Sequence, residues 1–314
     1  MRGIIICILK LLGKCVKQIL PLHAYCQLKD RTLSLIPINI YKQYSYRNRR
    51  NIIKYLKNDE SSEKRAIRDF LINNRSASMV FPYAFALRYN PDNIEVQISP
   101  PPPRKHVLYD GKRLFFKKAW DDTAIKNYFN GLLVEQDKES PHYYLAEDEC
   151  RPAEGSVIAD IGAAEGIWAL KFADKCEKVY LFECDEEWIG ALEQTFAPWR
   201  DKVVIVNKFV GSADDGEKFI TLDTFFADKR IDYIKADIEG AEEDMLKGGK
   251  TTFSNKLKGA VICAYHKQDD EQTITRYLGE YNFGKIETSD GYMIFEFDNL
   301  QPPYLRRGLV FARR

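Results

Sequence analysis

Short apolar runs that alternate with amphipathic segments dominate the second half of the chain. The runs lie near residues 156–161, 178–183, 203–207, 231–237 and 259–265. Strands that alternate with helices predict a parallel sheet covered by helices on both faces. The end of the chain is also strand-rich, at residues 283–287, 292–297 and 309–311. The pattern therefore predicts an α/β fold with a mostly parallel sheet.

The part of the chain before this sheet has a different pattern. Residues 1–22 place three lysines on one helical face and apolar residues largely elsewhere, which predicts an amphipathic basic helix. Its apolar run is too short to span a bilayer. Residues 41–74 also predict basic helices, and two short strands are expected at 78–87 and 94–98.

A stretch of four consecutive prolines within residues 99–103 separates these two parts. Neither a helix nor a central strand accommodates such a stiff segment. We therefore expect a basic, largely helical N-terminal region at residues 1–106 and a second domain, which contains the sheet, at residues 107–314.

Three further elements are predicted between the prolines and the sheet. Residues 107–116 indicate a hairpin around the turn Asp110-Gly111, because this dipeptide favours two-residue hairpin turns. A helix at 122–135 and a shorter one at 142–149 are expected to lead into the first strand of the sheet.

Composition and charge narrow the class of protein. Hydrophobic residues make up 45% of the 314 positions and aromatic residues 13%, which is enough for a packed core. Residues 1–120 hold 23 Lys and Arg against 8 Asp and Glu, whereas residues 121–314 hold 24 against 38. This asymmetry indicates two parts that dock on each other, or contact with a polyanion or membrane surface. We expect residues 1–22 to pack on the protein or to lie on an anionic membrane, and we expect no nucleic-acid partner.

The cysteines bear on the cellular compartment. They are seven in number, scattered, and form no C-x-x-C pair. This spacing argues against a disulfide framework and against a zinc site. Free thiols fit a reducing environment, so we expect a cytoplasmic protein, with peripheral membrane contact as an option.

The loop after the first strand of the sheet contains candidate cofactor contacts: Asp160, Gly162, Ala163, Ala164, Glu165 and Gly166. Glycines at this position let the backbone approach a ligand. The next strand ends in Glu183, where an acid can hydrogen-bond both hydroxyls of a ribose. Together they predict a nucleoside-bearing cofactor, although the loop alone is also compatible with a turn that binds nothing. A dinucleotide is disfavoured because the glycine spacing is not G-x-G-x-x-G. A P-loop nucleotide site is disfavoured because a Walker lysine is absent.

Several motifs resemble those of methyltransferases. The loop D-x-G-x-x-x-G is similar to the first loop of class I S-adenosylmethionine (SAM) methyltransferases, and residues 235–242 resemble the K-x-D-x-E-G-x-E signature of the FkbM family. The strand ending at Glu183, Thr-Leu-Asp at 221–223 and the strand ending in His266 match the same family in order. The resemblance covers roughly residues 133–311. It implies a class I (Rossmann-like) fold closed by an antiparallel hairpin, and SAM as cofactor.

The resemblance also implies roles for the cofactor residues. The loop at 162–166 would pass under the methionine part of SAM. Asp160 would brace this loop or accept a hydrogen bond from the cofactor amine, and Glu183 would hold the ribose. For both acids, capping or bracing a loop is the alternative.

The catalytic candidates follow the fourth and fifth strands of the sheet. Methyl transfer depends on alignment, and an alcohol acceptor also needs a base. His266 stands where such a base could reach the acceptor, and its ordinary pKa suits the task. Asp237 and Glu239 would both face the pocket, Asp237 near cofactor and acceptor alike, and Lys235 would pair with one of them.

The other histidines and the possibility of a metal ion remain to be assigned. We expect His23, His106 and His142 to be structural, because they lie outside the strand ends. Asp237, Glu239 and His266 could form an oxygen-rich divalent metal site. Acids that brace a turn or grip sugar hydroxyls are simpler, so we assign no metal.

The sequence as a whole predicts a SAM-dependent O-methyltransferase that acts on a hydroxyl of a sugar, glycan or related natural product. An N-methyltransferase and a binding or scaffold protein with a relic fold are the alternatives. The intact cofactor motif argues against the relic, and the glycine spacing argues against a dehydrogenase.

Overall fold

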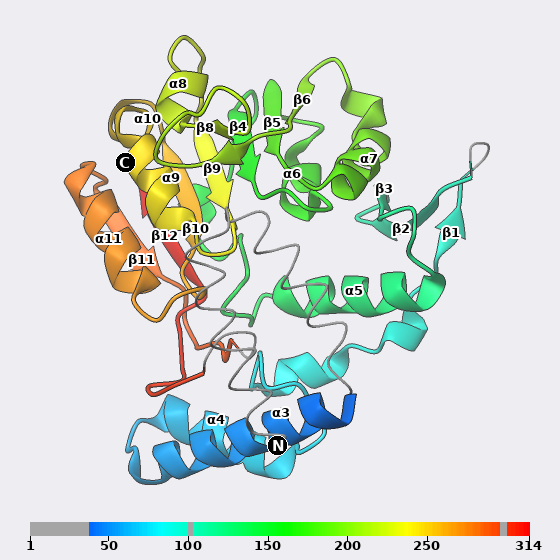
Figure 1. Cartoon of the computed structure of the whole chain (residues 1–314), viewed down its shortest axis with the longest axis vertical. Helices are drawn as coiled ribbons and strands as arrows, with labels where there is room; N and C mark the ends of the chain where they lie inside the picture. The colour runs from blue at the N-terminus through cyan, green and yellow to red at the C-terminus, as the bar shows by residue number, and fades with distance from the viewer. Residues whose placement is uncertain (1–37, 100–102, 296–299) are drawn as a thin grey trace. The chain divides into compact units, whose positions relative to one another are not determined.

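The computed structural model describes residues 38–99, 103–295 and 300–314, which divide into two compact units (Figure 1). Of the described residues, 38–80, 295 and 300–304 belong to the first unit. Phe81–Ile294 and Leu305–Arg314 form the second. The predicted helix at 1–22 lies outside the described residues, and the domain boundary at the prolines stays a prediction.

The first unit is helical, as predicted for residues 41–74. It contains α3 (Ile38–Tyr55), a 3₁₀ turn at Leu56–Asn58 and α4 (Ser62–Asn73). Arg49 is buried and donates three hydrogen bonds of 2.6–3.1 Å to carbonyl oxygens around the C-terminal end of α4. Because the last carbonyls of a helix have no partner within it, the bond from Arg49 to the Leu71 carbonyl helps to complete the end of α4. This cation of the basic region therefore serves the fold of its own unit.

The second unit is built on a seven-stranded sheet in the order β11-β12-β10-β9-β4-β5-β6. All strands run parallel except β12, which is antiparallel to both of its neighbours. The predicted α/β fold with a closing antiparallel hairpin is thus confirmed. The strands are β4 (Val157–Ile161), β5 (Lys178–Phe182), β6 (Val203–Val206), β9 (Tyr233–Ala236), β10 (Gly259–Cys263), β11 (Lys285–Thr288) and β12 (Leu309–Arg313).

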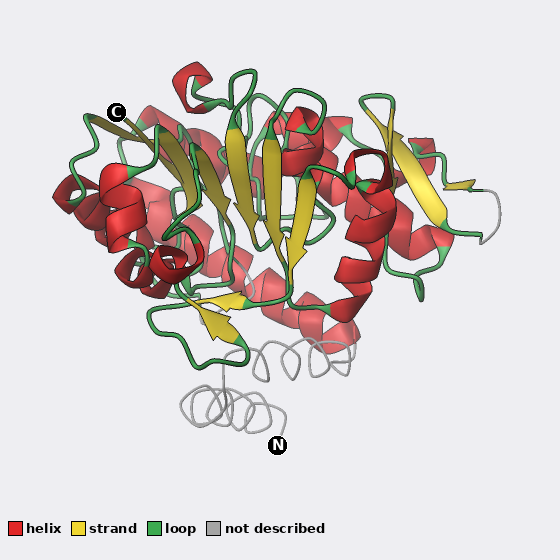
Figure 2. Ribbon diagram, turned by 90° about the horizontal axis from the view of Figure 1, so that it is seen from above, coloured by secondary structure: helices red, strands yellow, loops and turns green. Residues whose placement is uncertain are grey.

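Helices lie on both faces of this sheet (Figure 2). Every residue of β4, β9 and β10 is buried, as expected for strands covered on both sides. None of the described helices is both long and apolar enough to cross a membrane. The helices that follow the strands are α6 (Ile167–Phe172), α7 (Glu186–Thr195), α8 (Leu222–Phe225), α9 (Glu242–Gly248), α10 (Lys250–Asn255) and α11 (Asp270–Glu280).

The strand order changes direction between β4 and β9. The chain runs outward from β4 to β5 and β6, then returns to β9 on the other side of β4. In open parallel sheets, ligands bind at the carboxyl ends of the strands next to such a reversal. The fold therefore places the candidate site at the ends of β4 and β9.

Smaller elements surround the sheet. A three-stranded antiparallel sheet consists of β1 (Gln97–Ile98), β2 (Lys105–Tyr109) and β3 (Lys112–Phe115), with the predicted Asp-Gly turn between β2 and β3. Both turn residues have positive φ, as a type I′ hairpin turn requires. A parallel pair joins β7 (Phe209–Val210) to β8 (Phe219–Ile220), and α5 (Asp122–Glu135) has the predicted bounds.

Four predicted elements were wrong in whole or in part. Residues 78–87 form no strand, because Pro82 cannot donate to a ladder, and a 3₁₀ helix follows at Ala84–Arg88. The strand at 94–98 shrinks to β1. Residues 142–147 form turns instead of a helix, and a short 3₁₀ helix follows at Asp148–Cys150. In the described part of 292–297 only Met293 pairs, in an isolated bridge with Arg306.

Candidate functional site

The loop after β4 is held by its own backbone and by the neighbouring strands. Gly162 has φ +72°, and a Cβ atom there would lie 1.9 Å from the backbone oxygen of Asp237. Gly166 has φ +81°, and its Cβ would meet the ring of Phe196 at 2.7 Å. Both positions therefore need glycine, one for contact with the loop after β9 and one for contact with α7.

The amide groups of this loop are mostly used within the protein. The N–H groups of Gly162 and Ala163 both donate to the Phe182 carbonyl at 3.0 Å, and that of Gly166 donates to the Ala163 carbonyl. Ala164, with φ +46°, donates to Glu183 Oε2 at 2.8 Å. A pyrophosphate site needs free N–H groups. The loop is thus not a dinucleotide cradle, in agreement with its glycine spacing.

Glu183 lies half-buried where β5 ends. Its Oε1 accepts hydrogen bonds from the N–H groups of Cys184 and Asp185, and its Oε2 accepts the one from Ala164. A carboxylate has about four lone-pair sites, so one remains on Oε2. Glu183 therefore fits a single ribose hydroxyl in this conformation, rather than the pair that its position suggested.

A buried ion pair lies beneath the loop. Lys235 Nζ is 3.0 Å from Asp160 Oδ1 and donates to the Gly162 carbonyl at 3.0 Å. Burial raises the pKa of Asp160, against the opposing effect of Lys235. Burial alone would lower the pKa of Lys235, but Asp160 and Asp237 raise it above its ordinary value. Lys235 therefore forms a close ion pair with Asp160, and its charge also acts on Asp237. The predicted pairing with Glu239 stays a prediction.

Asp237, directly after β9, lies at the centre of a polar cluster. Its Oδ2 accepts a hydrogen bond from the Tyr144 hydroxyl at 3.0 Å, and its Oδ1 one from the Tyr265 hydroxyl at 3.2 Å. His266 Nε2 lies 3.4 Å from Oδ1, and His142 Nε2 lies 3.8 Å from Oδ2. Burial would raise the pKa of Asp237, but the two histidines and Lys235 lower it to about 2. Asp237 is therefore an anion at neutral pH.

His266 forms a pair with Glu242, the first residue of α9. Its Nδ1 lies 3.0 Å from Glu242 Oε1, and both side chains are buried. Glu242 Oε1 also accepts a hydrogen bond from the Ile238 amide at 3.0 Å. Burial would lower the pKa of His266, but Glu242 and Asp237 raise it to about 9. The burial of Glu242 cannot be seen in the sequence, where it is simply an acid at the start of a helix.

His142 belongs to the site, although we predicted a structural role from its position in the sequence. Its ring is 1% exposed, and burial lowers its pKa to about 4, so the imidazole is neutral. The side chain of Gln136 donates to the His142 carbonyl at 3.1 Å and accepts from the Tyr144 amide at 3.3 Å. Gln136 thus holds the loop that brings both rings to Asp237.

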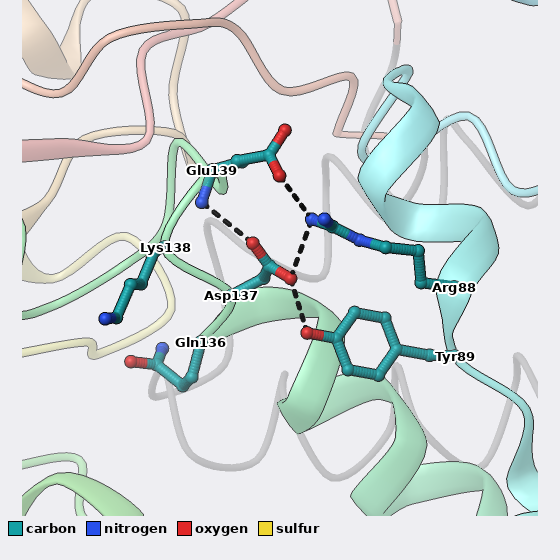
Figure 3. Close-up of a pocket in the computed structure, with 6 residues that line it drawn as sticks. All are labelled: Arg88, Tyr89, Gln136, Asp137, Lys138 and Glu139. Carbon is teal, nitrogen blue, oxygen red and sulfur yellow. Dashed lines mark hydrogen bonds and ion pairs between the residues drawn. The ribbon is translucent and has the colours of Figure 1, made fainter.

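A shallow hollow lies beside Gln136 (Figure 3). Three of its charged groups are paired with one another: Arg88 contacts Asp137 at 3.0 Å and Glu139 at 2.6 Å, and Tyr89 donates to Asp137. We assign this hollow to holding the loop rather than to chemistry.

Two further predicted site residues are Glu239 and Glu165. Glu239, with φ +55°, is exposed, and its charge helps to raise the pKa of His266. That its side chain faces the pocket stays a prediction. Glu165 is buried and accepts a hydrogen bond from the Tyr128 hydroxyl at 2.7 Å. Burial raises the pKa of Glu165 to about 6. A cofactor contact of Glu165 would have to be made by its backbone.

Two structural supports of the site were not visible in the sequence. The buried Arg306, just before β12, donates to the carbonyls of Tyr265 and His266 at 2.7 and 2.8 Å. In the Thr-Leu-Asp motif, Thr221 caps α8 and Asp223 accepts the amides of residues 251 and 252 at the start of α10. The motif therefore serves packing.

Comparison with known proteins agrees with this geometry. Residues 217–292 match the family model of the methyltransferase FkbM domain, which covers β9, Asp237, Glu242 and His266. The match confirms the predicted FkbM resemblance for the segment that it covers. It also supports a SAM-dependent methyltransferase as the class of enzyme. No curated protein matches the chain.

Several solved structures with a similar arrangement are methyltransferases. An FkbM methyltransferase from Methylobacillus flagellatus KT has 19% identity and a TM-score of 0.42, and the match covers 61% of this chain and 53% of that one. A precorrin-6y C5,15-methyltransferase from Geobacter metallireducens has 14% identity and a TM-score of 0.37, with 53% and 85% covered. A putative methyltransferase from Streptococcus mutans in complex with SAH has 13% identity and a TM-score of 0.35, and the match covers 51% of this chain and 89% of that one. Similarity at this level carries no information on substrate.

Proposed function

We propose that the chain is a SAM-dependent O-methyltransferase whose acceptor is a hydroxyl group of a sugar or glycan. The observation that supports this most directly is the Glu242–His266–Asp237 arrangement at the carboxyl ends of β9 and β10, one strand from the glycine loop. It combines the buried imidazole of His266, the Glu242 carboxylate beside its Nδ1, and the Asp237 anion beside its Nε2.

The cofactor end of the site fits SAM in shape and charge. Gly162 and Gly166 leave no room for side chains at the loop, and one acceptor site remains free on Glu183 for a ribose hydroxyl. SAM supplies an electrophilic methyl group on a positively charged sulfur. The Asp237 carboxylate gives the region next to the loop the negative charge that suits such a cation.

The acceptor end provides a base. Glu242 holds His266 through Nδ1, so Nε2 is directed toward Asp237 and is the nitrogen that can take the hydroxyl proton. At a pKa of about 9, only about one His266 in a hundred is neutral at pH 7. The positive charge of a bound sulfonium would lower the pKa of His266, because it disfavours the protonated, positively charged imidazole. Methyl transfer should thus become faster as the pH rises toward 9.

A sugar hydroxyl suits the other side chains around Asp237. The hydroxyl protons of Tyr144 and Tyr265 go to Asp237, so the two phenolic oxygens and the Asp237 carboxylate offer acceptors for the hydroxyl groups of a sugar. The resemblance to FkbM proteins, which are associated with O-methylation of sugars and polyketide hydroxyls, supports the same class of acceptor.

The proposal can be tested by incubating the full chain with SAM and a panel of mono- and oligosaccharides. We expect release of SAH together with an acceptor that gains one methyl group as a methyl ether. Transfer only to amines would favour an N-methyltransferase, and no transfer to any hydroxyl would contradict the proposed acceptor class.

A further inference from the structure

Three side chains of different chemistry converge at the carboxyl ends of β9 and β10. His142 comes from the loop before β4, Asp237 follows β9, and Cys263 ends β10. His142 Nε2 lies 3.5 Å from Cys263 Sγ and 3.8 Å from Asp237 Oδ2, and one ligand atom from each residue lies within 4.8 Å of the others. His142 and Cys263 are almost fully buried.

These separations suit a tetrahedral metal ion. Zinc bonds to nitrogen, oxygen and sulfur are about 2.0–2.3 Å long, so the ligand atoms of a tetrahedral site lie about 3.3–3.8 Å apart. Both distances from His142 Nε2 fall in this interval. An imidazole, a carboxylate and a thiolate are also the three ligand types that zinc takes in proteins.

The second nitrogen of His142 faces an acid, as in many metal sites. His142 Nδ1 lies 4.0 Å from Glu135 Oε2 at the end of α5, and Nδ1 makes no hydrogen bond in the described structure. Metal-bound histidines usually donate their other N–H to a carboxylate, which fixes the ring and its tautomer. A small shift of the half-exposed Glu135 would complete this contact and leave Nε2 free to bind a metal.

The cations around Asp237 are paired with acids of their own. Lys235, whose charge acts on both His142 and Cys263, is paired with Asp160 at 3.0 Å, and His266 is paired with Glu242 at 3.0 Å. Asp237 Oδ2 faces the Tyr144 hydroxyl and His142 instead. A divalent ion bound by Oδ2 and a Cys263 thiolate would be neutral overall.

We propose that His142 Nε2, Asp237 Oδ2 and Cys263 Sγ bind one divalent ion of the zinc type, with a fourth position open to water or a ligand. On binding, the Cys263 thiol releases its proton to solvent. The cysteine spacing argued against such a site, because spacing along the chain does not reveal ligands from three segments. The proposal does not depend on methyl transfer.

The test uses the full chain, stripped with a chelator and titrated with Co²⁺, which reports its ligands by absorption. We expect stoichiometric binding with a thiolate-to-cobalt band in the near ultraviolet, and its displacement by Zn²⁺. Cys263→Ser should abolish the band. Cys176→Ser, at an equally buried thiol before β5, should keep it. Glu135→Gln should weaken binding about 10–100-fold, as is typical when the acid behind a metal-bound histidine is removed.

Three results would overturn the proposal: no thiolate band in the wild type, the same band in Cys263→Ser, or loss of the band in Cys176→Ser. Circular dichroism shows whether each variant is folded. If Cys263→Ser does not fold, Glu135→Gln decides, because its half-exposed side chain tolerates the change, and an unchanged Co²⁺ affinity would refute the site.

Discussion

The charge of Glu242 should set the pH at which the enzyme works. Glu242 is fully buried, and its Oε1 lies 3.0 Å from His266 Nδ1. Replacement by glutamine keeps the size of the side chain and an oxygen for the Ile238 amide, but removes the charge. The His266 pKa should therefore fall toward its ordinary value.

The expected size of this fall follows from the wild-type pKa. The pKa of His266 is raised from an ordinary 6.5 to about 9, mainly by Glu242 and further by Asp237 and Glu239. Because Asp237 remains in Glu242→Gln, we expect a fall of about 1–2 pH units, which corresponds to about 1.4–2.7 kcal/mol. A raised histidine pKa stabilises the fold fully below pH 6.5, and this contribution is lost as the pH rises through 9. The unfolding free energy of the wild type should thus exceed that of the variant most near pH 6.

Two assays measure the change. The ring protons of His266 can be followed by NMR titration, and kcat/KM for methyl transfer can be measured from pH 6 to 10. Both should move to lower pH in Glu242→Gln. Glu243→Gln is the matched control, since Glu243 follows on the same helix and pairs with Lys247 at 3.0 Å. If His266 titrates at the same pH in Glu242→Gln and wild type, the assigned pair is wrong.

Three further predictions concern the loop, the ribose and the N-terminus. Gly162→Ala should destabilise the fold by about 3 kcal/mol or more in thermal unfolding, because φ is positive there and the new Cβ would collide with the Asp237 backbone. Gly131→Ala is the control and should be neutral or stabilising, because its Cβ would meet nothing. Equal effects of the two substitutions would refute the close approach of Gly162 to Asp237. Glu183→Ala should weaken SAM and SAH equally, by roughly 1.5–3 kcal/mol in calorimetry, since both share one ribose, and unchanged affinity would remove Glu183 from the cofactor site. Deletion of residues 1–22 should abolish salt-sensitive binding to anionic vesicles while SAM binding survives; vesicles that never bind the intact chain at low salt would leave packing as the role of this segment.

The sheet could be predicted from the sequence because its central strands β4, β9 and β10 are short, mostly apolar runs buried on both faces. The helix α5 could also be predicted, and Asp121 accepts the Ala124 amide at its start. The turns at 142–147 could not, since their residues are fixed by contacts with Asp237 and Gln136 rather than by local propensity.

The same distinction applies to the site. Asp237, Glu183 and His266 follow the ends of predicted strands. Because the carboxyl ends of parallel strands lie at one edge of the sheet, the alternation of strands and helices in the sequence places these residues at that edge. Asp237 and His266 come together there, and Glu183 contacts the loop after β4. His142 comes from an irregular loop whose path depends on tertiary contacts. Glu242 looks like a helix-opening acid until its burial against His266 is known.

Binding of the cofactor is the most direct test of the central claim that this fold holds SAM for methyl transfer. The intact chain is titrated calorimetrically with SAM, SAH and NAD, and its unfolding is followed with each ligand. We predict one-to-one binding of SAM and SAH, none of NAD, and a stabilisation of about 2.7 kcal/mol at a SAM concentration of 100 times Kd. Binding of NAD instead, or no binding and no stabilisation by SAM and SAH, would contradict the account.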